Sequence, residues 1–329
     1  MIQPITPNNP KVSVILPIYN QERFLQKALD SLAEQTLTDT EYICVNDGST
    51  DSSLKIITEQ AKKDNRFRVI DQQNQGTGRS RNNGLKLAKG EYIAFLDPDD
   101  WFERGALSSL YEQAKEQDCD MLVFDYKKID DNGNLLKKVS IAERVKRAFV
   151  LTDGATFNWR DIKGKLFGGL YFAAWNKLYR RDLVENNNLH FANCSFAEDS
   201  PFVLGSTLNA KRIGYSATAH YNYLIHDCSA IRTNKDENLC LFKSLDALKR
   251  ILRECGLTEE LAEEFDAYVV KRCNLDISKV ASQDTFESLR HQRISPRQNQ
   301  IVDTLRTTGS QILAILDGIK LKNNLALKK

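Results

Sequence analysis

The chain has 329 residues, of which 46 are lysine or arginine and 44 are aspartate or glutamate. The formal net charge of +2 argues against nucleic acid as a partner, because nucleic-acid-binding proteins carry a clear excess of positive charge. Seven cysteines without a Cys-x-x-Cys pair argue against zinc and against a disulfide framework. The first ten residues are polar, and no apolar run reaches the roughly 18 residues of a membrane span. We therefore expect a cytoplasmic protein with one large α/β domain and an appendage.

Apolar runs alternate with helical patterns in the first hundred residues. Four runs rich in β-branched and aromatic residues predict strands at 12–16, 41–45, 67–70 and 91–96. The segments between them predict helices at 21–35, 52–63 and 79–89. Strands that alternate with helices pair in parallel, and such sheets bind ligands beyond the carboxyl ends of their strands. The polar residues that follow the strands should therefore gather at one rim.

The last of these strands ends in acid. Asp97, Asp99 and Asp100 follow the apolar run closely, and Pro98 stops strand pairing there. Buried carboxylates need a cation or water, and hard oxygen ligands facing a diphosphate suit Mg²⁺ or Mn²⁺. The alternative is a solvated acidic turn that caps a helix starting near Trp101.

The rim lacks a dinucleotide fingerprint. The first strand is followed by Pro17-Ile-Tyr-Asn-Gln-Glu22, without the glycines that a Gly-x-Gly-x-x-Gly turn requires. A Gly-x-Gly turn occurs later, at Gly76, and leads into Arg79 and Arg81. Backbone donors and guanidinium groups at that helix start could hold a phosphate. Both arginines could equally be solvated helix residues.

In chain order, four motifs occur: Val-Ser-Val-Ile-Leu-Pro-Ile-Tyr-Asn, Asn-Asp-Gly-Ser-x-Asp, Gly-Arg-Ser-Arg-Asn-x-Gly-Leu and Gly-Glu-Tyr-Ile-Ala-Phe-Leu-Asp-Pro-Asp-Asp. This set resembles the family 2 inverting glycosyltransferases of bacterial surface glycan synthesis, densely over residues 11–125. The resemblance implies the GT-A fold, a Rossmann-like, mostly parallel sheet flanked by helices. It also implies a nucleotide-sugar donor, UDP-linked, and a glycan or glycolipid acceptor.

The resemblance also implies roles for single residues. Those expected at the donor are Pro17, Tyr19, Glu22, Asp47, Gly76, Arg79, Arg81, Asp97, His226 and Ser229. Asp47 would contact the base and Arg81 the phosphates. Asp97 and Asp99 would form the Asp-x-Asp element and are the candidate ligands of the Mn²⁺ or Mg²⁺ ion, with Asp97 nearer the ribose and Asp99 on the metal. Arg79 departs from the family pattern, which has a small residue there.

An acidic pair in the second half is the candidate for the base. Glu198 and Asp199 precede Pro201 at an expected helix start, where the family carries a Glu-Asp pair. A helix N-terminus stabilises an anion and so weakens it as a base, so that burial and Glu198 would have to raise the pKa of Asp199. The alternative is an ordinary helix cap.

Beyond the acidic pair, His226, Ser229 and Arg232 match the family's closing segment near the sugar diphosphate, although a surface loop is an equal alternative. We expect the catalytic domain to span residues 1–235 and a helical region to span 236–329, through which the chain could form an oligomer. The end of the chain, 312–329, mixes apolar and lysine residues. It could contact the inner face of a membrane, or simply pack or fray as a terminal helix.

The sequence thus predicts a metal-dependent transferase that moves a sugar to a hydroxyl with inversion. Two alternatives stay open: a nucleotide-sugar-binding protein without turnover, and a metal-dependent nucleotidyltransferase, which would release pyrophosphate.

Overall fold

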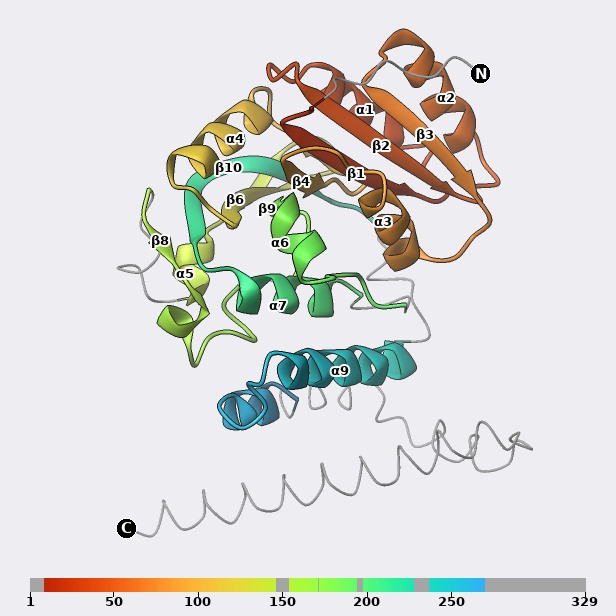
Figure 1. Ribbon diagram of the computed structural model, residues 1–329. Coiled ribbons are helices and arrows are strands. Elements are labelled where there is room, and N and C mark those ends of the chain that lie inside the picture. The colour runs from red at the N-terminus through yellow and green to blue at the C-terminus, as the bar shows by residue number, and fades with distance from the viewer. Residues whose placement is uncertain (1–8, 146–153, 171, 194–197, 228–236, 270–329) are drawn as a thin grey trace, which may run out of the picture. The chain divides into compact units, whose positions relative to one another are not determined.

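A computed structural model of the chain describes residues 9–145, 154–170, 172–193, 198–227 and 237–269. The expected fold class is confirmed, since a mostly parallel mixed sheet is flanked by helices (Figure 1). The strands are β1 (Val12–Ile18), β2 (Thr40–Asp47), β3 (Phe67–Gln72), β4 (Tyr92–Phe95), β5 (Trp101–Phe102), β6 (Met121–Asp130), β7 (Leu135–Val139), β8 (Thr156–Phe157), β9 (Lys177–Arg180) and β10 (Ile213–Ile225).

The strand order is β3-β2-β1-β4-β9-β6-β10-β5, with β7 beside β6 and β8 beside β10. The first four strands pair in parallel, as alternation with helices predicts. By contrast, β9 lies antiparallel between β4 and β6, and β5 pairs antiparallel with β10. The antiparallel strands bring residues of the second half of the chain beside the rim formed by the first half.

The helices are α1 (Leu25–Ala33), α2 (Ser53–Lys63), α3 (Thr77–Leu85), α4 (Ala106–Glu116), α5 (Ile141–Val145), the 3₁₀ turn η1 (Trp159–Ile162), α6 (Arg181–Asn186), α7 (Asp199–Asn209) and α9 (Glu237–Glu254). The alternative of a helix starting near Trp101 is wrong, because Trp101 and Phe102 pair with Asn222 and Tyr221 in the sheet. The expected helix start at Asp199 is confirmed.

Aromatic side chains fill the core where α7 meets the sheet. Phe191 stacks on Phe202 with ring centroids 4.3 Å apart, and Phe95 and Tyr179 meet Phe202 edge-on. These rings connect β4 and β9 to α7. Helix α7, whose start carries the acidic pair, is therefore fixed against β9 and against β4, the strand that precedes the Asp-x-Asp motif.

Chain contacts divide the molecule into residues Met1–Leu261 and Ala262–Lys329. The first unit extends past the expected boundary at residue 235, because α9 runs beside α7 (Figure 1) and buries Leu245, Leu248 and Leu252. In the second unit, residues 262–269 are helical. The separate C-terminal helical region stays a prediction.

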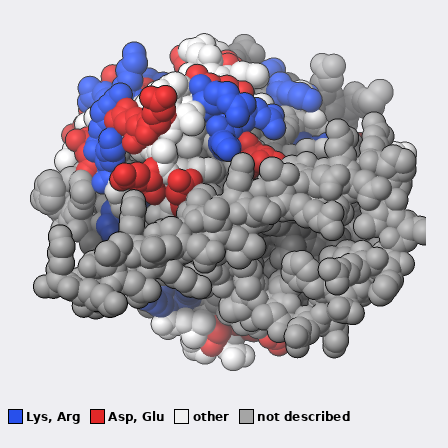
Figure 2. Space-filling model, turned by 90° about the horizontal axis from the view of Figure 1, so that it is seen from below, with Lys and Arg blue, Asp and Glu red and all other residues white. Residues whose placement is uncertain are grey.

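Among the described residues, no helix combines the length and the apolar character that crossing a membrane requires. On the face shown in Figure 2, lysine and arginine side chains lie next to aspartate and glutamate side chains within the described part. The segment 312–329, predicted to contact a membrane, lies outside the described residues.

Candidate active site

Two loops at the carboxyl ends of β1 and β2 hold each other in place. Asn20 adopts a left-handed conformation with φ of 51°, and its side-chain oxygen accepts a hydrogen bond of 2.8 Å from the Thr50 N–H. The Glu22 carboxylate accepts from the Ser52 N–H, while Asp51 accepts from the N–H groups of Glu22 and Ser53. Asp51 and Glu22 therefore each accept a hydrogen bond from a backbone N–H at the start of α2.

Asp47, at the end of β2, organises the glycine turn. One carboxylate oxygen accepts from the Gln72 side chain at 2.7 Å and the Gln75 N–H at 2.9 Å, and the other accepts from the Gly76 N–H at 2.8 Å. The side chain is 3% exposed. Asp47 thus fixes the turn that precedes α3, and its expected contact with a nucleoside base stays a prediction. Pro17 is buried within β1, whereas Tyr19 just beyond it is 48% exposed.

Helix α3 begins where the glycine turn meets the second half of the chain. Gly76 has φ of 90°, a conformation that glycine adopts at low cost. A methyl group on Gly78 would lie 2.3 Å from the Ala192 carbonyl oxygen, so this position requires glycine for close approach. Asn82 then anchors the same segment, since its side chain both donates to and accepts from the Phe191 backbone.

The Arg81 guanidinium gathers three carboxylates from distant parts of the chain. One terminal nitrogen donates to Asp97 at 2.7 Å, and the other donates to Glu198 at 3.0 Å and Asp199 at 2.5 Å. The Arg81 side chain is only 4% exposed. The expectation that Arg81 contacts phosphates is therefore not supported by its position, because its terminal nitrogens already bind carboxylates. Its structural role is to hold the Asp-x-Asp motif against the acidic pair.

The acidic pair has the electrostatics expected of a base. Burial raises the pKa of Asp199 to about 7; the guanidinium of Arg81 opposes the shift, and the charges of Glu198 and Asp97 add to it. Burial also disfavours the charge of Arg81, but Asp199, Asp97 and Glu198 outweigh it and raise the pKa of Arg81. The second oxygen of Asp199 accepts from the Ala174 N–H at 3.0 Å. A carboxylate with a pKa near neutrality suits proton transfer.

Asp99 and His226 form a second pair on the rim. The imidazole Nε2 lies 2.9 Å from the Asp99 carboxylate, which is 23% exposed, and Phe24 covers the histidine ring. Burial and the charge of Asp97 raise the pKa of Asp99, with His226 opposing. No group of three or more candidate metal ligands is present among the described residues. Mg²⁺ and Mn²⁺ do not need one when substrate phosphates complete their coordination.

Asp100 has a structural role and is not exposed at the rim. It is 1% exposed and accepts from the Leu224 N–H and the Tyr221 hydroxyl, both at 2.8 Å. The same hydroxyl accepts from the Asp97 N–H at 3.2 Å. The sequence did not predict the contact of Tyr221 with Asp97 and Asp100. The residue lies within the segment that forms β10, and nothing else in the sequence distinguishes it.

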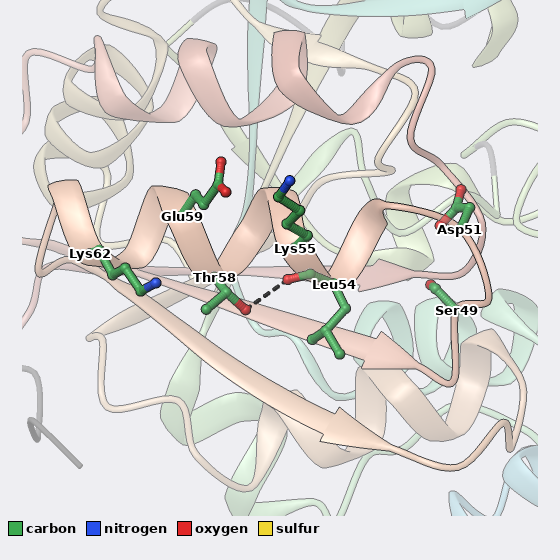
Figure 3. Close-up of a pocket in the computed structure, with 7 residues that line it drawn as sticks. All are labelled: Ser49, Asp51, Leu54, Lys55, Thr58, Glu59 and Lys62. Atoms are coloured by element: carbon green, nitrogen blue, oxygen red, sulfur yellow. Dashed lines mark hydrogen bonds between the residues drawn. The ribbon is translucent and has the colours of Figure 1, made fainter.

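The remaining candidates are Arg79, Ser229 and Arg232. Arg79 is exposed on α3, and within the described part of the chain its side chain makes no hydrogen bond or ion pair. Ser229 and Arg232 lie outside the described residues. A surface hollow along α2 (Figure 3) is lined by Ser49, Asp51, Leu54, Lys55, Thr58, Glu59 and Lys62. None of the expected donor residues lines it, so we do not assign it to the donor.

The structure thus brings Asp97, Asp99, Glu198 and Asp199 to one sheet rim, with His226 beside Asp99. The chain as a whole is similar to known proteins. A solved structure of Staphylococcus aureus TarS 1-349 in complex with UDP-GlcNAc is similar, with a TM-score of 0.61 and 25% identity over 86% of this chain and 76% of that one.

Curated proteins with similar sequences are described as glycosyltransferases. The putative glycosyltransferase EpsH of Bacillus subtilis is 33% identical, over 92% of this chain and 87% of its own length. The uncharacterized glycosyltransferase EpsJ of the same organism is 38% identical, over 80% of this chain and 75% of its own length. The family model described as Glycosyl transferase family 2 matches residues 13–187, which include the motifs of β1, β2, α3 and β4. With its sheet, its acidic rim and these relatives in agreement, the chain belongs to glycosyl transferase family 2.

Proposed function

We propose that this enzyme transfers a sugar from a UDP-sugar to a hydroxyl of a glycan or glycolipid, with inversion at the anomeric carbon and with the help of a divalent metal ion. The observation that carries the proposal is the acidic rim: Asp97, Glu198 and Asp199 share the Arg81 guanidinium, and Asp99 lies two residues from Asp97. This arrangement supports a base next to a diphosphate site.

A uridine donor is supported by the similarity to TarS, which was solved with UDP-GlcNAc. In this chain, the loops after β1 and β2 are held together through Asn20 and Asp51, and Tyr19 stands exposed beside them. An exposed aromatic ring next to a rigid loop can stack on a base. We therefore assign the nucleoside to this side of the rim, with Asp97 toward the ribose.

The chemistry of transfer requires one proton acceptor. Asp199 takes the proton of the acceptor hydroxyl. At the same time the oxygen of the acceptor bonds to the anomeric carbon from the face opposite the diphosphate. The bond between that carbon and the diphosphate oxygen breaks, and UDP leaves with the bonding electrons. The products are the inverted glycoside, UDP and protonated Asp199, so no covalent enzyme intermediate is needed.

Asp99 and His226 are the residues that would hold the metal. Two ligands at neighbouring corners of an octahedron, each ~2.1 Å from Mg²⁺, lie about 3.0 Å apart. The imidazole Nε2 and the Asp99 oxygen are 2.9 Å apart, and imidazole and carboxylate are both suitable ligands for Mn²⁺. A bound Mn²⁺ or Mg²⁺ ion would neutralise charge on the departing diphosphate.

A donor screen tests the proposal. The purified chain is incubated with UDP-GlcNAc, UDP-glucose, UDP-galactose and nucleoside triphosphates, with Mn²⁺, Mg²⁺ or EDTA, and release of UDP and pyrophosphate is measured. We expect slow UDP release from at least one UDP-sugar with metal and none with EDTA. Pyrophosphate release from a triphosphate, or no UDP release under any condition, would overturn the proposal.

A separate variant tests Asp99 as a metal ligand. Asp99→Asn should abolish UDP release and the effect of Mn²⁺ on UDP affinity in a calorimetric titration, because an amide replaces an anionic ligand. Asp131→Asn, at an exposed turn, is the matched control and should keep the wild-type metal response. An unchanged metal response in Asp99→Asn would rule out this ligand.

A further inference from the structure

A buried lysine lies at the start of β9, on the far side of a peptide group that contacts Asp199. Lys177 is fully buried, and its ammonium donates to the Ala173 carbonyl at 2.8 Å and to the Asn176 side-chain oxygen at 2.7 Å. Neither the motif pattern nor the expected chemistry pointed to this residue. Its position next to the acidic pair appears only in the folded chain.

The geometry joins Lys177 to Asp199 through one amide. The Ala173 carbonyl and the Ala174 N–H belong to the same peptide group, and that N–H donates to Asp199 at 3.0 Å. The described chain contains no cis peptide bond, so the carbonyl and the N–H point in opposite directions. The ammonium therefore sits at the negative end of the amide dipole and the carboxylate at its positive end.

Hydrogen bonds in such a series strengthen one another. A cation on the carbonyl draws electron density from the amide, which makes its N–H a better donor to the carboxylate. A better donor stabilises the charged form of Asp199 and holds one of its oxygens in place. The other oxygen of Asp199 faces Arg81.

Packing alone does not explain a lysine here. Burying an ammonium group costs free energy that an apolar side chain of the same length would not cost. Burial lowers the pKa of Lys177 to about 7, with the charge of Asp199 opposing that shift and Arg144 adding to it. A residue kept at such cost beside the acidic pair is better explained by an effect on that pair.

We propose that Lys177 is a positioning residue for the reaction, and that it fixes and charges the Ala173–Ala174 peptide so that this peptide orients Asp199 and stabilises its anion. The inference rests on the proposed role of Asp199 as base. Other titratable groups that act on Asp199 include Arg81, Glu198, Asp97 and Tyr179.

The test compares Lys177→Met with wild type in the hydrolysis of the UDP-sugar that gives the fastest UDP release, as a function of pH. The methionine keeps the length but loses the charge and the donor. Asp199 acts as a base when it is deprotonated, and the variant stabilises its anion less. The acidic limb of kcat should therefore move upward by about one pH unit, which is a roughly tenfold loss of kcat at the acidic end. KM for the donor should change less than about threefold.

Two further variants separate charge from structure. Lys177→Gln keeps a neutral donor and should give a smaller loss than methionine. Lys115→Met removes an exposed lysine that pairs with Glu91 and should leave the profile unchanged. Hydrogen exchange of the peptide that contains Ala174 gives a readout apart from activity, and we expect faster exchange in Lys177→Met.

The outcomes distinguish the two proposals. If wild type releases UDP and Asp199→Asn does not, but Lys177→Met keeps the wild-type acidic limb and exchange rate, the positioning role is overturned and the function stands. A loss of kcat that is equal at every pH and follows a lower Tm also overturns it, because Lys177 then only supports the fold. If wild type releases no UDP, the proposed function is contradicted, and the role of Lys177 that rests on it is contradicted with it.

Discussion

Arg81 is the residue on which the site depends most directly. It is buried and holds three carboxylates, one from the segment after β4 and two from the start of α7. Burial raises the pKa of Asp199, the positive charge of Arg81 opposes this shift, and the charges of Glu198 and Asp97 add to it. Its main effect is therefore on the electrostatics of the base and on the folding of the rim.

Replacing this arginine tests that role. Arg81→Met should lower the free energy of unfolding by about 3–5 kcal/mol, because removing one partner leaves buried carboxylates without compensation. Lys115→Met, which removes an exposed pair with Glu91, should cost less than ~1 kcal/mol. Chemical denaturation of both variants measures the difference, and equal losses would contradict the buried role.

The stability loss of Arg81→Met should also depend on pH. The folded state raises the pKa of Asp199 to about 7 even with the arginine present, and the variant should raise it further. A carboxyl with a raised folded pKa favours folding at low pH, and this contribution is lost as the pH rises through that pKa. Both proteins should lose stability in parallel up to about pH 7, and the difference should widen above pH 7, where only the variant still holds the proton in the folded state; a gap independent of pH would contradict this.

At the scale of elements, α3 connects the two halves of the site. Its glycine turn is fixed by Asp47, its first turn touches Ala192 at Gly78, and Asn82 binds the Phe191 backbone. The segment that follows these contacts leads to Glu198 and Asp199. The helix therefore sets the distance between the acidic pair and the Asp-x-Asp motif.

A single methyl group tests this contact. Gly78→Ala should push the Ala192 backbone away and destabilise the chain by about 1–3 kcal/mol, with a loss of UDP release. Gly168→Ala is the matched control, since the added carbon meets nothing within 4 Å, and it should change stability by less than ~0.5 kcal/mol. Thermal unfolding measures both, and an undisturbed Gly78→Ala would mean that α3 does not constrain the acidic pair.

The sequence predicted the parallel elements well because their signals are local. Helix α1 begins at Leu25 rather than at residue 21, because residues 20–22 are hydrogen-bonded to the loop after β2. Helix α3 begins at Thr77, earlier than expected, because Gly76 with its positive φ ends the preceding turn. These differences come from loop contacts across about thirty residues, which periodicity cannot show.

The antiparallel strands and the buried polar contacts could not be predicted in the same way. Strand β9 pairs with β4 across more than eighty residues, and nothing in its short pattern specifies that neighbour. Arg81 meets Glu198 at a sequence separation of 117. Its surroundings, like those of Lys177, depend on tertiary packing, so the predicted phosphate contact of Arg81 rested on local context alone.

At the scale of the whole molecule, two halves of the chain build one rim. The first half supplies the parallel sheet and the Asp-x-Asp motif, and β9, α7 and β10 add the turn at Ala174, the acidic pair and His226. Neither half contains both the proposed metal ligands and the proposed base. The proposed function therefore depends on Asp199 acting as the base at this shared rim.

The most direct measurement is the pH dependence of UDP release by Asp199→Asn, with Asp182→Asn on the exposed side of α6 as the matched control. For wild type we expect an acidic limb of kcat near pH 7, since burial raises the pKa of Asp199 to about 7. We predict that Asp199→Asn lowers kcat by ~10²- to 10⁴-fold, keeps donor affinity and Tm, and loses this limb. Asp182→Asn should behave as wild type. Near-normal turnover by a folded, donor-binding Asp199→Asn would contradict the account and direct attention to Glu198.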